Sequence, residues 1–247
     1  DDNTDRRTTP VVNYALIAAN ILVFVFLQGL GSNEKFMMAY STVPAEIASG
    51  QDVVTEDRVA QDPSTGQIFD VPGLQPTPLS VYLTLLTAMF MHVGFAHIAG
   101  NMLYLWIFGD NIEDRLGHSR YLIFYLLSGV LASLAHVFST FTFGGDPNIP
   151  SLGASGAISG VLGGYLILFP GKRVRVLMFN MLQEVPSIVA IGFWFVLQLF
   201  SGIGSMGGQG GGIAYAAHIG GFVAGLVLVK LFAMGTREPD VFVGRVR

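Results

Sequence analysis

Six apolar runs separated by polar segments divide the chain, and most approach the roughly 20 residues that a helix needs to cross a bilayer. None of the runs contains Asp or Glu, and Lys230, near the end of the last run, is their only Lys or Arg. The runs fall at about 11–30, 79–108, 121–141, 153–169, 186–203 and 213–234. This pattern predicts an all-α, polytopic membrane protein with a bundle of six transmembrane helices.

The second and fourth runs differ in length from a simple span. Residues 79–108 would form a helix of about 45 Å at 1.5 Å per residue, which exceeds the ~30 Å hydrocarbon core. We therefore divide this run near Gly94 into an interfacial segment at about 79–91 and a span from about 94 to 110. The fourth run, 153–169, is short, so its helix should begin below the membrane surface and leave a cavity above its N-terminus.

The polar segment 32–78 predicts a long, membrane-associated external loop between the first two spans. Its turn signals include Asp62-Pro63 and Val71-Pro72-Gly73, and a loop of this length is usually functional or disordered. No segment repeats at a fixed period. We therefore expect one membrane domain over 1–247, with 236–247 as a cytoplasmic tail.

Composition and charge support the membrane interpretation and give it an orientation. Charged residues make up 12% of the chain, against about a quarter in soluble domains. If the N-terminus is cytoplasmic, 11 of the 13 Lys and Arg residues fall on the inner side, as the positive-inside rule requires. Both termini are therefore predicted to be cytoplasmic. The net charge of −4 gives no basis for a nucleic-acid partner, and the absence of cysteine excludes thiolate chemistry.

Candidate chemistry inside the apolar runs rests on serine and histidine. A proton-coupled transporter normally needs an ionisable residue in mid-membrane, and the motif of a His-Glu-x-x-His zinc protease is absent. Ser155 lies within one turn of the outer end of the fourth span. His218 in the sixth span and His97 and Asn101 in the second share this outer layer, and His97 and Asn101 also share a helix face. The arrangement fits a nucleophile with a general base.

Two stripes of small residues offer a way to bring these helices together. Small residues four apart allow close helix approach, and they form two sets, Gly156, Gly160 and Gly164 in the fourth span and Ala217, Gly221 and Gly225 in the sixth. If the stripes meet, Ser155 and His218 come close. Without a buried carboxylate, we expect a dyad whose histidine is oriented by packing. Structural readings stay open, because the serine could serve packing or back-bonding and the other polar side chains could simply hold helices together.

Four motifs occur in order from the second span to the sixth. They are His92-x-x-x-x-His97-x-x-x-Asn101, Glu113-Asp114-Arg115-Leu116-Gly117, Gly153-Ala154-Ser155-Gly156 and Ala217-His218-x-x-Gly221-x-x-x-Gly225. Together they resemble the rhomboid family of intramembrane serine proteases. Glu113 and Arg115 lie on the predicted inner side, away from the chemistry, and we assign them to loop structure.

The resemblance implies an intramembrane serine endopeptidase. Ser155 would be the nucleophile, and His218 the general base and later the acid. His97, Asn101 and the backbone N–H of Ser155 would form the oxyanion hole. The family cuts single-span membrane proteins in or near the transmembrane segment, so the implied partners are such substrates and the lipid bilayer. It needs no cofactor, and no metal is expected.

Two departures from the family pattern are visible. Certain bacterial members carry a tyrosine one turn after the nucleophile, which stacks on the catalytic histidine. Ser159 occupies that position here, which leaves the orientation of His218 open. The external loop is also longer than in the simplest members, which suggests that 50–78 is an insertion with a function of its own.

The resemblance also suggests how a substrate would enter. Phe193, Trp194 and Phe195 resemble the lateral gate of the family, although aromatic residues that face lipid would give the same pattern. The glycine-rich linker 202–212 resembles a cap over the site, with Met206 as a plug.

Localisation and two alternative functions follow from the same residues. The lack of a presequence rich in Arg and Ser favours a bacterial-type plasma membrane, with the site opening to the external side. The first alternative is an inactive family member that binds membrane clients. The second is a metal or small-solute site built on His92, His97 and His218, since three histidines suit zinc.

Overall fold

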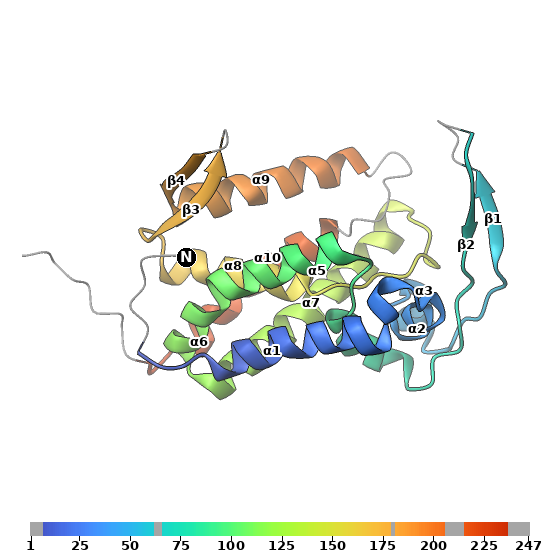
Figure 1. The fold of residues 1–247 in the computed structure, drawn as a ribbon, viewed down its shortest axis with the longest axis horizontal. Helices are drawn as coiled ribbons and strands as arrows, with labels where there is room; N and C mark the ends of the chain where they lie inside the picture. Colours follow the sequence, from blue (N-terminus) through green and yellow to red (C-terminus); the bar gives the residue numbers. More distant parts are fainter. Residues whose placement is uncertain (1–6, 62–65, 179–180, 206–214, 237–247) are drawn as a thin grey trace, which may run out of the picture.

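The computed structural model describes residues 7–61, 66–178, 181–205 and 215–236, and it is mostly helical (Figure 1). The first apolar run forms α1 (Val11–Leu22), which continues as a π-helical segment, Val23–Leu27. The third to sixth runs form α7 (His118–Phe143), α8 (Ser155–Leu168), α9 (Ser187–Ser205) and α10 (Tyr215–Phe232). Each predicted apolar run is therefore helical over most of its described length.

The second run is broken where the sequence predicts a break. A 3₁₀ turn (Val81–Leu83), α4 (Thr84–Thr87) and a second 3₁₀ turn (Ala88–Phe90) form its first part. After residues 91–94 the chain continues as α5 (Phe95–Tyr104), a π-helical segment (Leu105–Gly109) and α6 (Asp110–Leu116). The two parts are bent by 82°. The division of this run near Gly94 is confirmed.

Helix length separates the spans into two groups. Within the described residues, α7 and α10 are long and apolar enough to cross a membrane, and the bent pair Val81–Phe90 and Phe95–Leu116 would be a third span. Val11–Leu27, Ser155–Leu168 and Ser187–Gly202 are shorter apolar helices. At 1.5 Å per residue, α8 is about 21 Å long, in keeping with the short helix expected there. The total of six spans stays a prediction.

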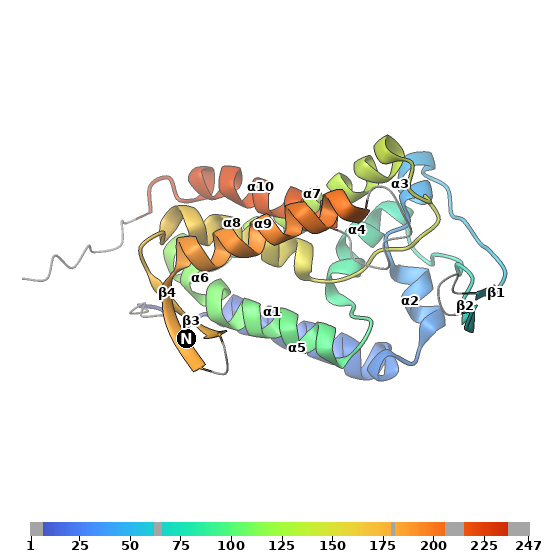
Figure 2. The same cartoon turned by 90° about the horizontal axis from the view of Figure 1, so that it is seen from above.

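Two β-hairpins depart from the expected all-α fold. β1 (Arg58–Gln61) pairs with β2 (Ile68–Val71), and β3 (Arg173–Met178) pairs with β4 (Met181–Pro186), both antiparallel. They stand at opposite ends of the molecule (Figures 1 and 2). In β3, basic and apolar residues alternate and Val174 is buried, which is a period-2 signal of a strand.

The segment 32–78, which the sequence predicts to be external, is structured over its described residues and supports the loop that leads into α8. It contains α2 (Glu34–Tyr40) and α3 (Pro44–Ser49), followed by the β1–β2 hairpin. Between the two helices, Thr42 and Ser151 exchange backbone hydrogen bonds of 3.0 and 2.8 Å. The segment therefore supports the chain that leads into α8, while its association with the membrane stays a prediction.

The two stripes of small residues meet, which satisfies the condition for bringing Ser155 close to His218. A Cβ on Gly221 would lie 2.1 Å from the carbonyl oxygen of Gly156, and one on Gly225 would lie 2.0 Å from that of Gly160. No side chain fits in such a space, so the backbones of α8 and α10 are in direct contact. This contact sets the distance between the helices that carry Ser155 and His218.

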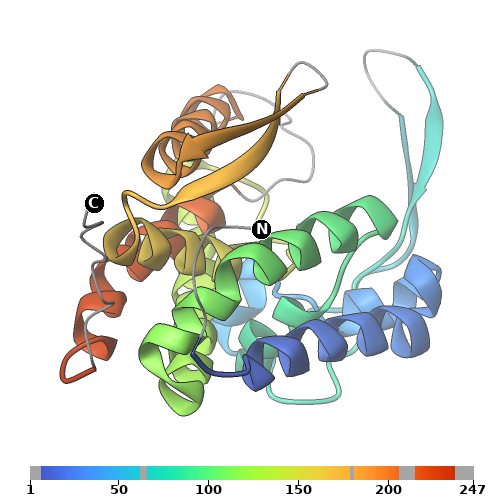
Figure 3. The same ribbon diagram turned by 60° about the vertical axis from the view of Figure 1, so that its left-hand side comes forward.

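α6 and the start of α7 lie between the start of α1 and the end of α10 (Figure 3), and their side chains contact both. The carboxylate of Glu113 accepts hydrogen bonds from the backbone N–H groups of Val12 and Asn13, at 2.9 and 2.7 Å, at the start of α1. Arg120 donates to the carbonyl oxygens of Phe232 and Met234 at the end of α10, where a cation is favoured by the helix dipole. The first and last described helices thus begin and end on the same side, whereas the side of the membrane stays a prediction.

Gly225→Ala should separate α8 from α10. Overpacking a helix contact costs about 1–3 kcal/mol, so we expect a lower Tm in detergent micelles. Gly100→Ala in α5 is the matched control, because a Cβ there meets nothing within 4 Å and alanine favours a helix. An unchanged Tm in Gly225→Ala would contradict the direct backbone contact.

A buried carboxyl in the segment 32–78 makes the stability of the protein depend on pH. Glu46 in α3 is buried, and its Oε1 accepts the Val53 N–H at 3.1 Å. Burial raises the pKa of Glu46 above its ordinary value of 4.5, and the charge of Asp52 also raises it, while the Val53 hydrogen bond opposes both. The folded state therefore binds this proton more tightly than the unfolded state does.

Glu46→Gln should remove this pH dependence. In the native protein, the contribution of Glu46 to the free energy of unfolding falls as pH rises from 4.5 through the raised pKa. The variant should be more stable than the native protein at pH 7 and should vary less between pH 4.5 and 7. Thermal unfolding at both pH values measures this, with the exposed Glu34→Gln as control. If the change in Tm between pH 4.5 and 7 were the same in the native protein and in Glu46→Gln, the raised pKa of Glu46 would be contradicted.

Candidate active site

Ser155 is the first residue of α8, and a constrained glycine precedes it. Gly153 has φ of +135°, and its N–H donates to the carbonyl of Ala88 at 2.8 Å. A Cβ on Gly153 would lie 3.0 Å from Cε1 and 3.2 Å from Nε2 of His97, and 3.6 Å from Oγ of Ser155. Only glycine suits both the positive φ and the crowding, so the loop brings Ser155 and the His97 ring to the same point.

The structure brings Ser155 and His218 into hydrogen-bond contact. Oγ of Ser155 lies 2.8 Å from Nε2 of His218, a normal hydrogen-bond length. The two residues come from α8 and α10, whose glycines are in backbone contact. This is the contact that a serine nucleophile and its general base require.

A third residue, which the sequence analysis missed, contacts the other side of the imidazole. Nδ1 of His218 lies 2.7 Å from Oε1 of Gln198 in α9. An amide oxygen only accepts, so Nδ1 carries the hydrogen and Nε2 is left to accept from Ser155. The expectation that packing alone orients His218 is therefore wrong. Gln198 is the only amide or ionisable residue in the run 186–203, and that isolation was the available signal.

Ser159 does not fill the place of the stacking tyrosine. Its hydroxyl donates to the carbonyl oxygen of Ser155 at 2.6 Å, within α8. The rings of Trp194 and Tyr215 lie near the imidazole of His218 instead, with centroids at 6.2 and 6.5 Å.

His97 and Asn101 present hydrogen-bond donors in α5. Nδ1 of His97 accepts the N–H of Val93 at 3.4 Å, so Nε2 carries the hydrogen. Asn101 is only 8% exposed, and its Nδ2 has no hydrogen-bond partner among the residues that the structure describes. Ser155 opens α8, where the first N–H groups lack an intrahelical acceptor. All three are groups expected to face a developing oxyanion.

A buried glutamine that the sequence analysis also missed fixes the break before α5. The side chain of Gln28 donates to the carbonyl of His92 at 2.8 Å and accepts its N–H at 2.9 Å. His92 lies with its ring centroid 5.0 Å from that of His97. Within the described residues, no group of three His, Cys, Asp or Glu side chains could hold a metal ion, so the geometry gives the three-histidine alternative no support.

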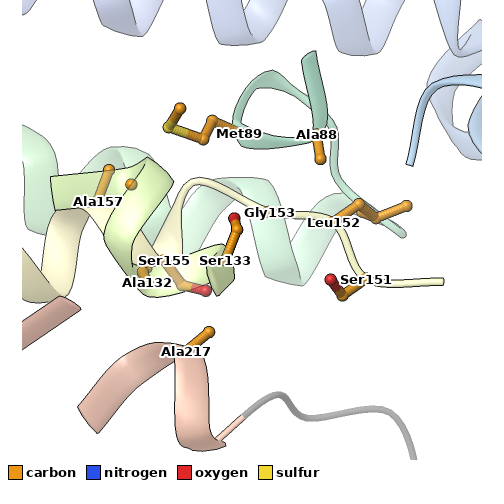
Figure 4. A pocket seen from close by; sticks show the side chains of 12 residues that line it. Ala88, Met89, Ala132, Ser133, Ser151, Leu152, Gly153, Ser155, Ala157 and Ala217 are labelled. Atoms are coloured by element: carbon orange, nitrogen blue, oxygen red, sulfur yellow. The ribbon is translucent and has the colours of Figure 1, made fainter. Parts of the chain in front are cut away.

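A small pocket lies behind Ser155 (Figure 4). Its volume is about 30 Å³, enough for a water molecule. Figure 4 shows that its lining comes from the turn before the break, from α7, from the loop before α8 and from α8 itself, with Ala217 of α10 below. The hydroxyl residues Ser133 and Ser151 are part of this lining.

The three gate candidates differ in position. Phe195 stacks on Phe222 of α10 with ring centroids 4.2 Å apart, and Trp194 lies 6.2 Å from the same ring. Phe193 is 65% exposed. Two of the three aromatics therefore pack against α10, and only Phe193 faces outward. Met206 and most of the linker 202–212 lie outside the described residues.

The fold and this site define a helical membrane protein in which a serine at the start of a short internal helix contacts a histidine of the neighbouring helix. The family model described as Rhomboid domain matches residues 80–235. The chain belongs to the rhomboid family.

Named relatives come from bacteria and from mitochondria. Rhomboid protease GluP of Bacillus subtilis (strain 168) is 38% identical over 140 residues, which cover 55% of this chain and 26% of GluP. Rhomboid protein 1, mitochondrial, of Saccharomyces cerevisiae is 31% identical over 156 residues, covering 62% and 43%. The presenilin-associated rhomboid-like protein, mitochondrial, of Homo sapiens is 28% identical over 169 residues, covering 61% and 44%. The matches span less than half the length of these relatives.

Proposed function

We propose that this chain is an intramembrane serine endopeptidase that uses a Ser155–His218 dyad to hydrolyse peptide bonds in or near transmembrane segments. The observation that carries the proposal is the 2.8 Å contact between Oγ of Ser155 and Nε2 of His218. Family membership and the likeness to GluP, a named protease, support it. An intact dyad argues against the inactive client-binding alternative.

The first chemical step forms an acyl-enzyme. Nε2 of His218 takes the proton of the Ser155 hydroxyl while Oγ attacks the carbonyl carbon of the substrate. The carbonyl oxygen then carries the negative charge. When the C–N bond breaks, the same Nε2 returns its proton to the departing amine nitrogen.

The oxyanion is the charge that the site must stabilise. Nε2 of His97, Nδ2 of Asn101 and the backbone N–H of Ser155 are its proposed donors. Donors fixed before the reaction stabilise a developing charge without reorganising. The N-terminal end of α8 adds the positive end of its dipole to the same place.

The second step hydrolyses the acyl-enzyme. A water gives one proton to Nε2 of His218 and its oxygen bonds the acyl carbon. The bond from this carbon to Oγ then breaks, and the proton returns to Ser155. The pocket beside Ser155 is large enough to supply such a water. The dyad needs no cofactor for either step.

The setting proposed for this reaction is a bacterial-type plasma membrane. The charge distribution supports cytoplasmic termini and a site that opens externally. Single-span membrane proteins are the proposed substrates, and they would enter from the bilayer beside α9, past Phe193, Trp194 and Phe195.

Ser155→Ala and His218→Ala should each abolish cleavage of a single-span model substrate in proteoliposomes, because each removes one half of the dyad. Ser139→Ala is the matched control, since its hydroxyl donates within its own helix, to the carbonyl of His136, and this variant should cleave normally. Full cleavage by Ser155→Ala would refute the proposal.

Asn101→Ala should lower kcat by about 10²–10³-fold with little change in KM, the effect of losing one oxyanion donor. Steady-state cleavage kinetics measure both constants, with the exposed Asn148→Ala as control. A higher KM with unchanged kcat would instead make Asn101 a ground-state binding residue and contradict its proposed role.

A further inference from the structure

The helix that carries Gln198 is fixed at its start and borders the site further along. At its first residue, Ser187, the hydroxyl donates to the carbonyl of Phe169 at 2.6 Å and the N–H to that of Lys172 at 2.7 Å. From there α9 runs along the edge of the bundle (Figure 1). It reaches the site through Trp194 and Gln198, which lie four residues apart and so share one helix face.

We propose that Gln198 is a positioning residue for the catalytic histidine, and that α9 thereby controls the orientation and tautomer of the His218 ring. The side-chain carbonyl of Gln198 accepts the hydrogen of Nδ1 and holds the ring with Nε2 toward Ser155. This inference rests on the proposed function and deepens it.

Gln198 is the only hydrogen-bond partner of Nδ1 that the described part of the chain provides. The hydroxyl of Ser159, one turn after the nucleophile in α8, is engaged with a helix carbonyl. Trp194 and Tyr215 contribute ring surfaces, which restrict the tilt of the imidazole but do not choose which nitrogen carries the hydrogen. Without Gln198, nothing described would favour the tautomer with a free acceptor at Nε2.

Because the side chain of Gln198 is a neutral amide, its removal should lower the rate only modestly. A carboxylate in this place would both fix the tautomer and stabilise the imidazolium that forms during catalysis. Glutamine does only the first. A neutral hydrogen bond of this kind corresponds to about 3- to 10-fold in rate, well below the loss expected from removing either member of the dyad.

The hydrogen-bond acceptor of His218 Nδ1 belongs to α9. A movement of that helix would therefore change how the catalytic histidine is oriented. Phe195 stacks on Phe222 of α10 and keeps this part of α9 packed. A substrate that moved this part of α9 outward would take Gln198 from His218, so the base would be correctly set only once α9 had returned. Movement of the gate candidates on α9 and orientation of the catalytic histidine are thus coupled through Gln198.

Gln198→Leu replaces the amide with a branched apolar side chain of similar bulk, one bond shorter, and so removes the acceptor. We expect kcat for the single-span model substrate to fall about 3- to 10-fold with little change in KM, and the rate of Ser155 labelling by a fluorophosphonate to fall by the same factor. Tm in detergent should not fall. Unchanged kcat and labelling would overturn the inference.

Gln198→Glu tests positioning separately from folding. Its carboxylate should accept from Nδ1 as glutamine does and should also stabilise the imidazolium, so kcat above neutral pH should not fall more than about 3-fold below that of the native protein. The acidic limb of the pH profile of kcat should move to higher pH, since a nearby carboxylate favours the imidazolium. A profile identical to that of the native protein would overturn the inference, even if Gln198→Leu failed to fold.

Leu197→Ala is the matched control in α9, because Leu197 is 45% exposed and next to Gln198, and it should change neither kcat nor the pH profile. If Leu197→Ala and Gln198→Leu lowered kcat equally, the loss would be due to helix packing, and the inference would be overturned. Failure of the proposed function is distinguishable, because then the native protein itself would neither cleave the substrate nor label at Ser155.

Discussion

Direct backbone contact between α8 and α10 is the constraint on which the rest of the site depends. A side chain as short as that of Ser155 reaches His218 of another helix at 2.8 Å because the two helices lie close together. Gly221 against the Gly156 carbonyl and Gly225 against that of Gly160 provide that closeness. In a membrane, lipid tails are as apolar as leucine, so such packing, and not the hydrophobic effect, drives helix association. The glycines that allow the contact are therefore as necessary to the site as the reacting groups.

A second set of contacts places the oxyanion donors. Gln28 bonds both backbone groups of His92 and fixes the break between the two parts of the second apolar run. Because the break is fixed, α5 begins where His97 can lie against Gly153. The site is thus assembled from four parts of the chain, and a different contact holds each part. These are the glycine contacts of α8 with α10, the hydrogen bonds of the Gln28 side chain to the backbone of His92, the backbone bridge of Thr42 to Ser151, and the Gln198 side chain of α9.

Patterns with a period could be predicted from the sequence, whereas single long-range contacts could not. The apolar runs and the break near Gly94 follow from helix length, and the spacing of small residues shows which helix faces are able to approach closely. Gln198 and Gln28 were missed because each acts through one side chain on a partner far along the chain. The hairpin β3–β4 was missed because its alternation of charged and apolar residues is short, and basic residues there had already been explained by membrane orientation.

Mapping the residue that a fluorophosphonate modifies tests the central claim most directly. The native protein in micelles would be treated with the reagent, digested, and analysed by mass spectrometry. If α8 and α10 hold Ser155 against His218, the adduct is on Ser155, while Ser133 and Ser151, which line the same pocket, stay unmodified. An adduct on either of these serines, or none in folded protein, would contradict the account.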